Sequence, residues 1–407
     1  HALTSSQLAA LTTDQIHAAT TDHLRALDVK QVAALTTAVL AELTSAQLGA
    51  FTSKQLSGFT TTQIPAFAAN ALPGIDTAAI KGLQSAQLVA LTTAQVAALT
   101  TDQVQALTNR QVSAFETTDL NVLTSEQIIA LTSGQVAALT TAQVSHLATT
   151  QLAAIETADV QALKTAQLAS LTTDQITGFG TEQVASLLTS QTVGIGTAQL
   201  AAFATDQLTA LSTAQLAALR AEQFRSLTPT QIAAMLTDQV RGLTTKALVT
   251  LTSDQVQAFT ADQIGALTLE QIAALRTTSV SVLTTDQIAA LTTDQVAAMT
   301  ASEIRSLTST QLLGFSTAQI AAIETRDLAA LSSDQLNALA TEQVAAFTTD
   351  QVAALTTGQL AALDGSRLVA LTSDQIAALT TRQVRSLTTD QVGALTTGQV
   401  VALETDD

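Results

Sequence analysis

The chain has 407 residues, of which 47% are hydrophobic and 12% are charged, and its formal net charge is -17. This hydrophobic content excludes a disordered polar tail, which cannot bury enough apolar surface to fold. The 33 acidic residues against 16 basic ones argue against nucleic acid as a partner, because phosphate binding depends on Lys and Arg. Cys is absent from the sequence, which excludes disulfides, thiol catalysis and Cys-bound metals.

An eight-residue repeat starts at Leu3 and runs through fifty complete octads to residue 402 without an insertion or a deletion. Numbered from 1 to 8, the octad has the consensus L-T-T-x-Q-V-x-A. Position 1 is a large apolar residue except at Ala19, position 6 is apolar except at Thr192, and position 5 is Gln in 39 octads. A fixed period is typical of a solenoid. Because loops tolerate insertions, the unbroken register predicts one continuous solenoid over residues 1–407, which we expect to be part of a longer chain.

The repeat is irregular at residues 65–82, which have the sequence PAFAANALPGIDTAAIKG. Pro65 and Pro73 stand at position 7, and Ala71 and Ala79 replace the usual Gln at position 5. A bend in the solenoid, a contact site for a partner and plain sequence drift each explain this pattern. The sequence leaves these three interpretations open.

Residues 91–107, LTTAQVAALTTDQVQAL, show which structure the octad can form. One long helix is excluded, because eight residues turn through a net angle of about 80° and the apolar positions would spread around the helix. T-x-x-Q is the capping-box pattern of a helix start, and the next Thr pair ends the helix. Further along the chain, Pro229 stands at position 3, which suits the first residue of a helix. The sequence leaves undecided whether the Thr at position 2 or the residue at position 3 is the cap.

These features predict an all-α repeat solenoid, a tight superhelix with one very short helix per octad. An isolated helix of this length is unstable in water, so stacking of the octads must stabilise it. Val and Ile at position 6 and the paired Thr residues also favour strands. A β-solenoid is therefore the alternative fold.

Two sets of residues follow from the predicted superhelix. Positions 1 and 6 should line its axis, and the representative residues are Leu91, Val96, Leu99, Val104 and Leu107. We expect the Gln side chains to hydrogen-bond backbone groups of an adjacent repeat, since short helices leave many such groups without a partner and an amide both donates and accepts. The representatives of this second set are Gln95, Gln103 and Gln111.

The sequence contains no pattern typical of an active site or a metal site. Ser and Thr follow the repeat, so no nucleophile with a base and an orienting acid stands out, and we expect no enzyme activity and no cofactor. The four His residues lack the spacing of metal ligands: His1, His17, His23 and His146. The acidic residues allow weak Ca2+ binding, although no calcium-loop motif occurs. Polar residues interrupt every apolar run, so we expect no transmembrane segment.

Residues 348–363, TTDQVAALTTGQLAAL, resemble the L-T-x-x-Q-[VIL]-x-A arrays of very large bacterial surface and secreted proteins, which are adhesin-like or form a matrix. The resemblance implies a structural protein outside the cell. We expect a fibre, filament or sheath that assembles with copies of itself, head to tail or side by side. An adhesin stalk or a solenoid that binds a ligand is the alternative function.

Overall fold

The computed structural model describes residues 3–403, and over this range it contains helices and no strands. The predicted all-α repeat array is therefore confirmed, and the alternative of a β-solenoid is wrong. Every α-helix, from α1 (Ser5–Leu8) to α48 (Thr397–Ala402), begins at position 3 of its octad and ends at position 6, 7 or 8. The two helices of a different kind are the 3₁₀ helices η1 (Ile64–Ala66) and η2 (Ala69–Gly74).

Position 2 comes directly before each α-helix, and in most octads its side chain caps the helix. At α11 (Thr101–Ala106), Thr100 Oγ1 accepts a hydrogen bond from the backbone N–H of Gln103 at 3.1 Å, and Gln103 Oε1 accepts one from the N–H of Thr100 at 2.9 Å. This capping box satisfies two donors that a helix start otherwise leaves free. Position 2 is thus the cap, and position 3 is the first helical residue, as Pro229 shows in α27 (Pro229–Ala234).

The links between helices need no residue in the left-handed conformation. After α11, Leu107 has φ -58° and ψ 143°, and Thr108 has φ -74° and ψ 156°, so positions 1 and 2 are extended. Positive φ angles are absent throughout the described part of the chain. Because most residue types adopt extended angles freely, the chain can change direction at every octad without a loop and with few Gly residues.

The chain divides into two compact units, unit 1 (residues 1–210) and unit 2 (residues 211–407). Each is an array of octads: unit 1 ends with α24 (Thr205–Ala210), and unit 2 starts with α25 (Thr213–Ala217). The continuity of one solenoid across both units stays a prediction.

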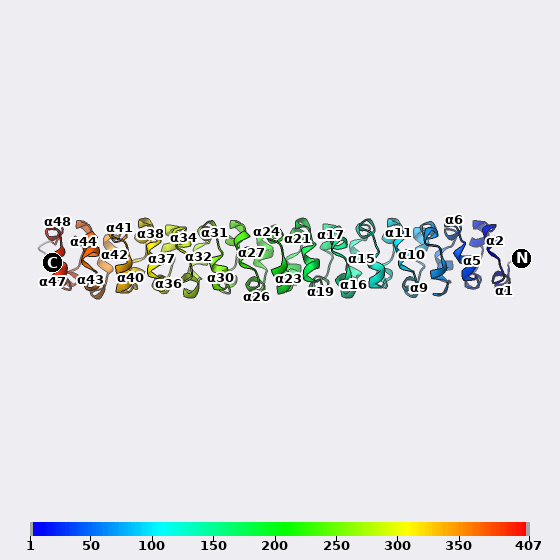
Figure 1. The fold of residues 1–407 in the computed structure, drawn as a ribbon, viewed down its shortest axis with the longest axis horizontal. Coiled ribbons are helices and arrows are strands. Elements are labelled where there is room, and N and C mark those ends of the chain that lie inside the picture. Colours follow the sequence, from blue (N-terminus) through cyan, green and yellow to red (C-terminus); the bar gives the residue numbers. More distant parts are fainter. Residues whose placement is uncertain (1–2, 404–407) are drawn as a thin grey trace. The chain divides into compact units, whose positions relative to one another are not determined.

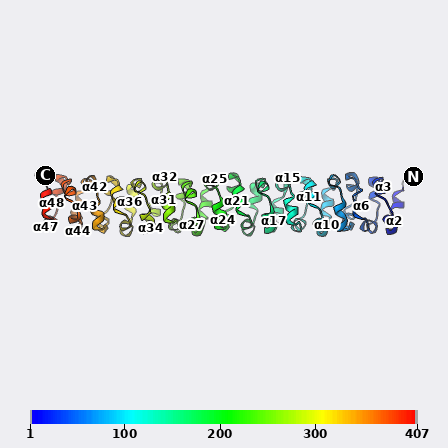
Figure 2. The same cartoon turned by 90° about the horizontal axis from the view of Figure 1, so that it is seen from above.

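Within each unit, a helix packs on the third helix before it and the third helix after it. In unit 1, α14 (Ser125–Ile129) packs on α17 (Thr149–Ala154), and in unit 2, α35 (Thr293–Ala297) packs on α38 (Thr317–Ala322). Figures 1 and 2 show, from two directions, the short helices of each unit wound about that unit's axis. Each unit is therefore a superhelix whose successive turns stack on one another.

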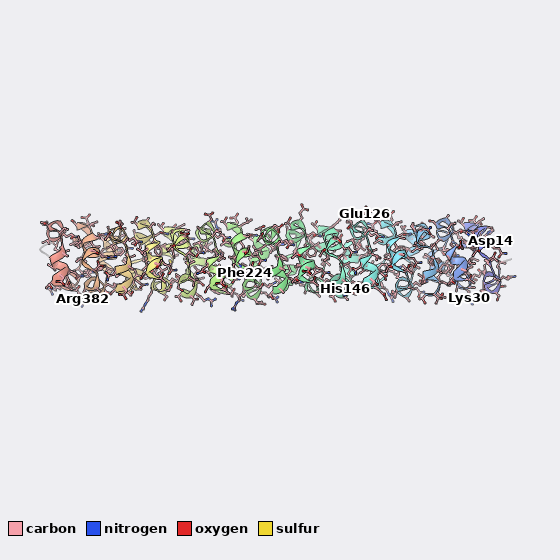
Figure 3. The ribbon with its side chains drawn as sticks, viewed as in Figure 1. Asp14, Lys30, Glu126, His146, Phe224 and Arg382 are labelled. Carbon is pink, nitrogen blue, oxygen red and sulfur yellow. The ribbon has the colours of Figure 1, made fainter. Side chains whose placement is uncertain are left out.

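The core of each unit lies along its axis and consists of positions 1 and 6. Val104 and Leu107 are 2% and 4% exposed, and Phe224 at position 6 is 0% exposed. Figure 3 shows Phe224 inside unit 2, whereas the charged side chains of Asp14 and Arg382 lie on the outside of their units. The octad thus turns its two apolar positions to the axis and its variable polar positions to solvent.

Candidate functional site

The Gln side chains at position 5 join one turn of the superhelix to the previous turn. Gln103 is 1% exposed, and its Nε2 donates to the carbonyl oxygens of Leu72 and Ile75, both at 2.8 Å. Its Oε1 accepts from the N–H of Thr100 in its own octad at 2.9 Å. One buried amide therefore uses both of its donors and its acceptor, as a buried polar group must if it is not to destabilise the fold.

Gln95 and Gln111, the other two residues predicted to bond an adjacent repeat, have the same surroundings. They are 2% and 3% exposed, and each Nε2 donates to two carbonyl oxygens, 31 and 28 residues earlier, at distances of 2.7 to 3.0 Å. The acceptors are the carbonyls of Ile64, Phe67, Ile80 and Leu83. The structure thus brings all three Gln residues against the backbone of the preceding turn.

The acceptors come from the same two octad positions in both units. They are the carbonyls of position 6 and of the following position 1, at the helix end. The position 6 carbonyl also accepts the N–H of that position 1, as Ile264 does from Leu267 at 3.2 Å. In unit 2, Gln295 donates to Ile264 at 3.0 Å and to Leu267 at 2.6 Å, again 31 and 28 residues earlier. These separations place between three and four octads in one turn. We call this series of contacts the Gln ladder.

Some octads carry another residue at position 5. Arg367 keeps part of the Gln ladder, since its Nε donates to the carbonyl oxygen of Leu339, 28 residues earlier, at 3.2 Å. Ala71, Ala79 and Ala247 are 5% exposed or less and have no side-chain donor. Four acidic residues are also buried at this position: Asp119, Asp159, Glu303 and Asp327.

Burial changes the titration of three of these acids. It raises the pKa of Asp119, Glu303 and Asp327 above the ordinary range, because the charged carboxylate loses its hydration. The fourth acid, Asp159, accepts a hydrogen bond at its Oδ1 from Ser133 Oγ at 2.5 Å. Among the described residues, one carboxyl oxygen of Glu303 and both of Asp327 are buried without a hydrogen bond.

The apolar residues predicted to line the axis lie in the core of unit 1. Their exposed fractions range from 0% to 6%: Leu91, Val96, Leu99, Val104 and Leu107. Sequence reasoning did not identify the acceptors of the Gln ladder, because a backbone carbonyl is present at every position and gives no signal. It also did not single out Arg367 or the buried acids, although each breaks the pattern at position 5.

The three His residues that the structure describes do not form a cluster. His17 Nε2 lies 3.3 Å from a surface carboxylate, His23 Nδ1 accepts from the N–H of Thr20 at 3.3 Å, and His146 is exposed. His1 lies outside the described residues. Across the described part of the chain, no group of three His, Cys, Asp or Glu side chains is placed to hold a metal ion. Weak Ca2+ binding stays a prediction. No helix that the structure describes has the length and apolar character needed to cross a membrane.

The fold and the Gln ladder define a repeat protein of the all-α solenoid class. The chain belongs to the ALTTAQ repeat family, which matches most of its length. The matches cover residues 72–109, 112–149, 152–189, 192–229, 200–237, 232–269, 269–301, 320–357 and 377–405. Those that begin at residues 72, 112, 152, 192 and 232 are 40 residues apart, which is five octads, so they follow the register of the repeat. No curated protein matches the chain.

Proposed function

We propose that the protein is a structural protein outside the cell, which forms a fibre, filament or sheath by stacking of its repeat. The observation that carries this proposal is the uniform joint between turns, in which one Gln amide and two backbone carbonyls recur in both units. Each octad of such an array depends only on nearby octads, so the array has no intrinsic length.

The same joint offers a route to assembly between copies. The turns within residues 3–403 carry backbone carbonyls and Gln side chains of the kind that the Gln ladder joins, so two copies whose end turns meet can stack through them. Stacking through these groups would be head to tail, and a head-to-tail contact that does not close produces a filament. The location outside the cell rests on the resemblance of the octads to arrays of bacterial surface and secreted proteins.

Contacts between the sides of the superhelices are a second route. Val89, Ile129 and Leu313 are apolar residues at position 7 with exposed fractions of 43%, 46% and 54%. The net charge of -17 opposes close approach of two copies, and this repulsion is screened by salt. Side-by-side association should therefore increase with ionic strength, whereas the hydrogen bonds of a head-to-tail joint depend on it less.

Electron microscopy of the purified chain, over a range of protein and salt concentrations, tests the proposal. We expect filaments that lengthen with protein concentration. In the purified 407-residue chain, replacing Gln7 and Gln15 by Leu should shorten the filaments, because two donors of a joint at that end of the molecule are lost. Replacing Ile129 and Leu313 by Lys is the matched control, which should reduce only the bundling of filaments. Single particles with the mass of one chain under all conditions would contradict self-assembly and favour an adhesin stalk or a ligand-binding solenoid.

A further inference from the structure

Glu303 stands at position 5 of an octad in unit 2, where most octads have Gln, and it keeps the hydrogen bonds that a Gln side chain accepts. It lies in α36 (Ala301–Ser306) and is 2% exposed. Its Oε2 accepts hydrogen bonds from the N–H of Thr300 at 2.6 Å and from Thr300 Oγ1 at 2.9 Å. In the next octad, Gln311 Oε1 accepts from the same two groups of Thr308 at 2.8 and 3.1 Å. Glu303 Oε2 is therefore the equivalent of the Gln Oε1.

The other oxygen of Glu303 stands in the place of a donor. Gln311 Nε2 donates to the carbonyls of the residues 31 and 28 positions earlier, both at 2.8 Å. The corresponding residues for Glu303 are Ile272 and Leu275, so Glu303 Oε1 takes the place of the nitrogen that would donate to their carbonyls. Among the described residues, this oxygen is buried and has no hydrogen-bond partner. An acceptor thus stands where the regular octad has a donor, which costs stability if the carboxyl is ionised.

The packing on the acceptor side agrees with a weakened joint. Leu267 and Leu283, the position 1 residues on either side of Leu275 in the sequence, are each 5% exposed. Leu275 itself is only half-buried. Leu275 is thus less buried than the position 1 residues on either side of it, and its carbonyl is the one that lacks a Gln donor.

The charges around Glu303 do not compensate an ionised carboxylate. Burial raises its pKa most, the bonds from Thr300 lower it, and the charge of Asp327 raises it again. Asp327 lies on α39 (Thr325–Leu328), which packs on α36, and Arg326 Nε lies 3.2 Å from Asp327 Oδ1 rather than at Glu303. The other charged residues on the elements around Glu303 are Arg305 on α36, Glu324 at the start of α39, Arg276 at the start of α33 (Thr277–Val280) and Glu270 on α32 (Leu269–Ala273).

We propose that Glu303 is protonated in the folded chain and that its Oε1–H donates to the carbonyl of Ile272 or Leu275, as a Gln amide does elsewhere. The joint between α36 and the preceding turn is then closed in acid and loosens when the carboxyl ionises. The sign follows from the raised pKa: an acid that is harder to ionise in the folded state contributes stability below its unfolded pKa. That contribution is lost as the pH rises through the folded pKa. Protonation of Glu303 does not depend on self-assembly of the chain.

Hydrogen exchange measured by mass spectrometry, corrected for the intrinsic pH dependence of exchange, tests this joint in the full chain. Peptides within residues 269–307 should lose protection between pH 4 and pH 9, so that at the alkaline end they exchange about threefold faster or more than in Glu303→Gln. The variant should show no such loss, because its amide donates at every pH. Gln311→Glu is the matched variant in a regular octad, and its peptides should acquire the pH dependence.

Two outcomes would overturn the proposal. One is equal protection of the wild type and Glu303→Gln across the whole pH range. The other is full protection of the wild type at alkaline pH in the presence of Ca2+ and its loss with a chelator. That result would assign the partner of Glu303 Oε1 to a divalent cation instead of a proton.

Discussion

Residues 65–82 and residues 91–112, both in unit 1, use the same octad in two different ways. In residues 91–112, Gln95, Gln103 and Gln111 donate to the preceding turn. In residues 65–82, position 5 is Ala at both octads, and the 3₁₀ helix η2 replaces an α-helix around Pro73. The irregular segment is nevertheless the turn that accepts from these three Gln residues, through the carbonyls of Phe67, Leu72, Ile75 and Ile80.

The donors and the acceptors of the Gln ladder tolerate change differently. The acceptors are backbone carbonyls, which every residue provides and which stay in place even where the helix becomes a 3₁₀ helix. The donors are side chains, and one substitution removes them. An octad that has lost its Gln can therefore still receive the next turn, although it is attached less strongly to the previous one.

Other contacts hold the irregular segment where its donors are missing. The ring of Phe59 packs edge-on against those of Phe51 and Phe67, with centroid distances of 5.2 and 5.1 Å. Such pairs stabilise a fold beyond the area that they bury. Gly74 also approaches the previous turn so closely that an added Cβ would overlap the carbonyl oxygen of Ser45. Close packing thus replaces hydrogen bonding in this segment. None of the large exposed apolar side chains lies within residues 65–82, which disfavours the interpretation as a contact site.

The largest expected effect comes from removing the donors of the regular segment. Changing Gln95, Gln103 and Gln111 to Leu leaves an N–H and at least one carbonyl without a partner at each site. The loss of stability should be roughly 2–4 kcal/mol per site, measured by urea unfolding followed by circular dichroism. The matched control is Gln105→Leu at the exposed position 7, which should change stability little. A triple variant as stable as this control would show that the Gln ladder is not what joins the turns.

Much of this architecture could be predicted from the sequence, because the same residue pattern recurs in fifty octads. The spacing of the apolar positions predicted the core, and the T-x-x-Q pattern predicted the short helix. The recurrence of Gln at position 5 indicated a buried side chain that forms hydrogen bonds. The cap was undecided because both Thr positions carry suitable hydroxyls, and the hydrogen bonds of Thr100 and Gln103 decide it.

The number of octads in a turn could not be predicted, since it depends on which backbone carbonyls the Gln side chains reach. The surroundings of the buried acids could not be predicted from the sequence either. Glu303 looks in the sequence like a conservative change from Gln, and only the stacked turns show that one of its oxygens takes the place of a donor. The 3₁₀ helix η2 follows from Pro73, but the compensating contact of Gly74 with Ser45 lies in another turn.

A smaller effect is expected at the close approach in the irregular segment. Gly74→Ala places a Cβ against the backbone of Ser45, which cannot move as a flexible side chain would. The variant should lose about 1–3 kcal/mol of stability, measured by urea unfolding. Gly358→Ala, in α43 (Thr357–Ala362), is the control because no atom lies within 4 Å of the added Cβ. It should gain about 0.5–1 kcal/mol. Equal effects of the two changes would mean that turns can separate at Gly74 without cost.

The smallest expected effect is the restoration of a missing donor, which tests whether the irregular segment has lost more than its Gln side chains. Ala247→Gln changes a regular octad in α29 (Thr245–Leu248), where Thr244 caps the helix and the carbonyls 31 and 28 residues earlier belong to Leu216 and Leu219. We expect it to gain about 1 kcal/mol, the net value of a typical hydrogen bond.

Ala71→Gln makes the same change in η2, and its gain should be smaller, because the 3₁₀ helix turns a side chain to a different angle than an α-helix does. Thermal unfolding of the two variants against the wild type measures the difference. An equal gain at both sites would mean that the backbone of the irregular segment is still set for the Gln ladder and that drift removed only the side chain. A loss at Ala71→Gln, with a gain at Ala247→Gln, would mean that the 3₁₀ turn and its close packing have become an alternative joint that excludes the amide.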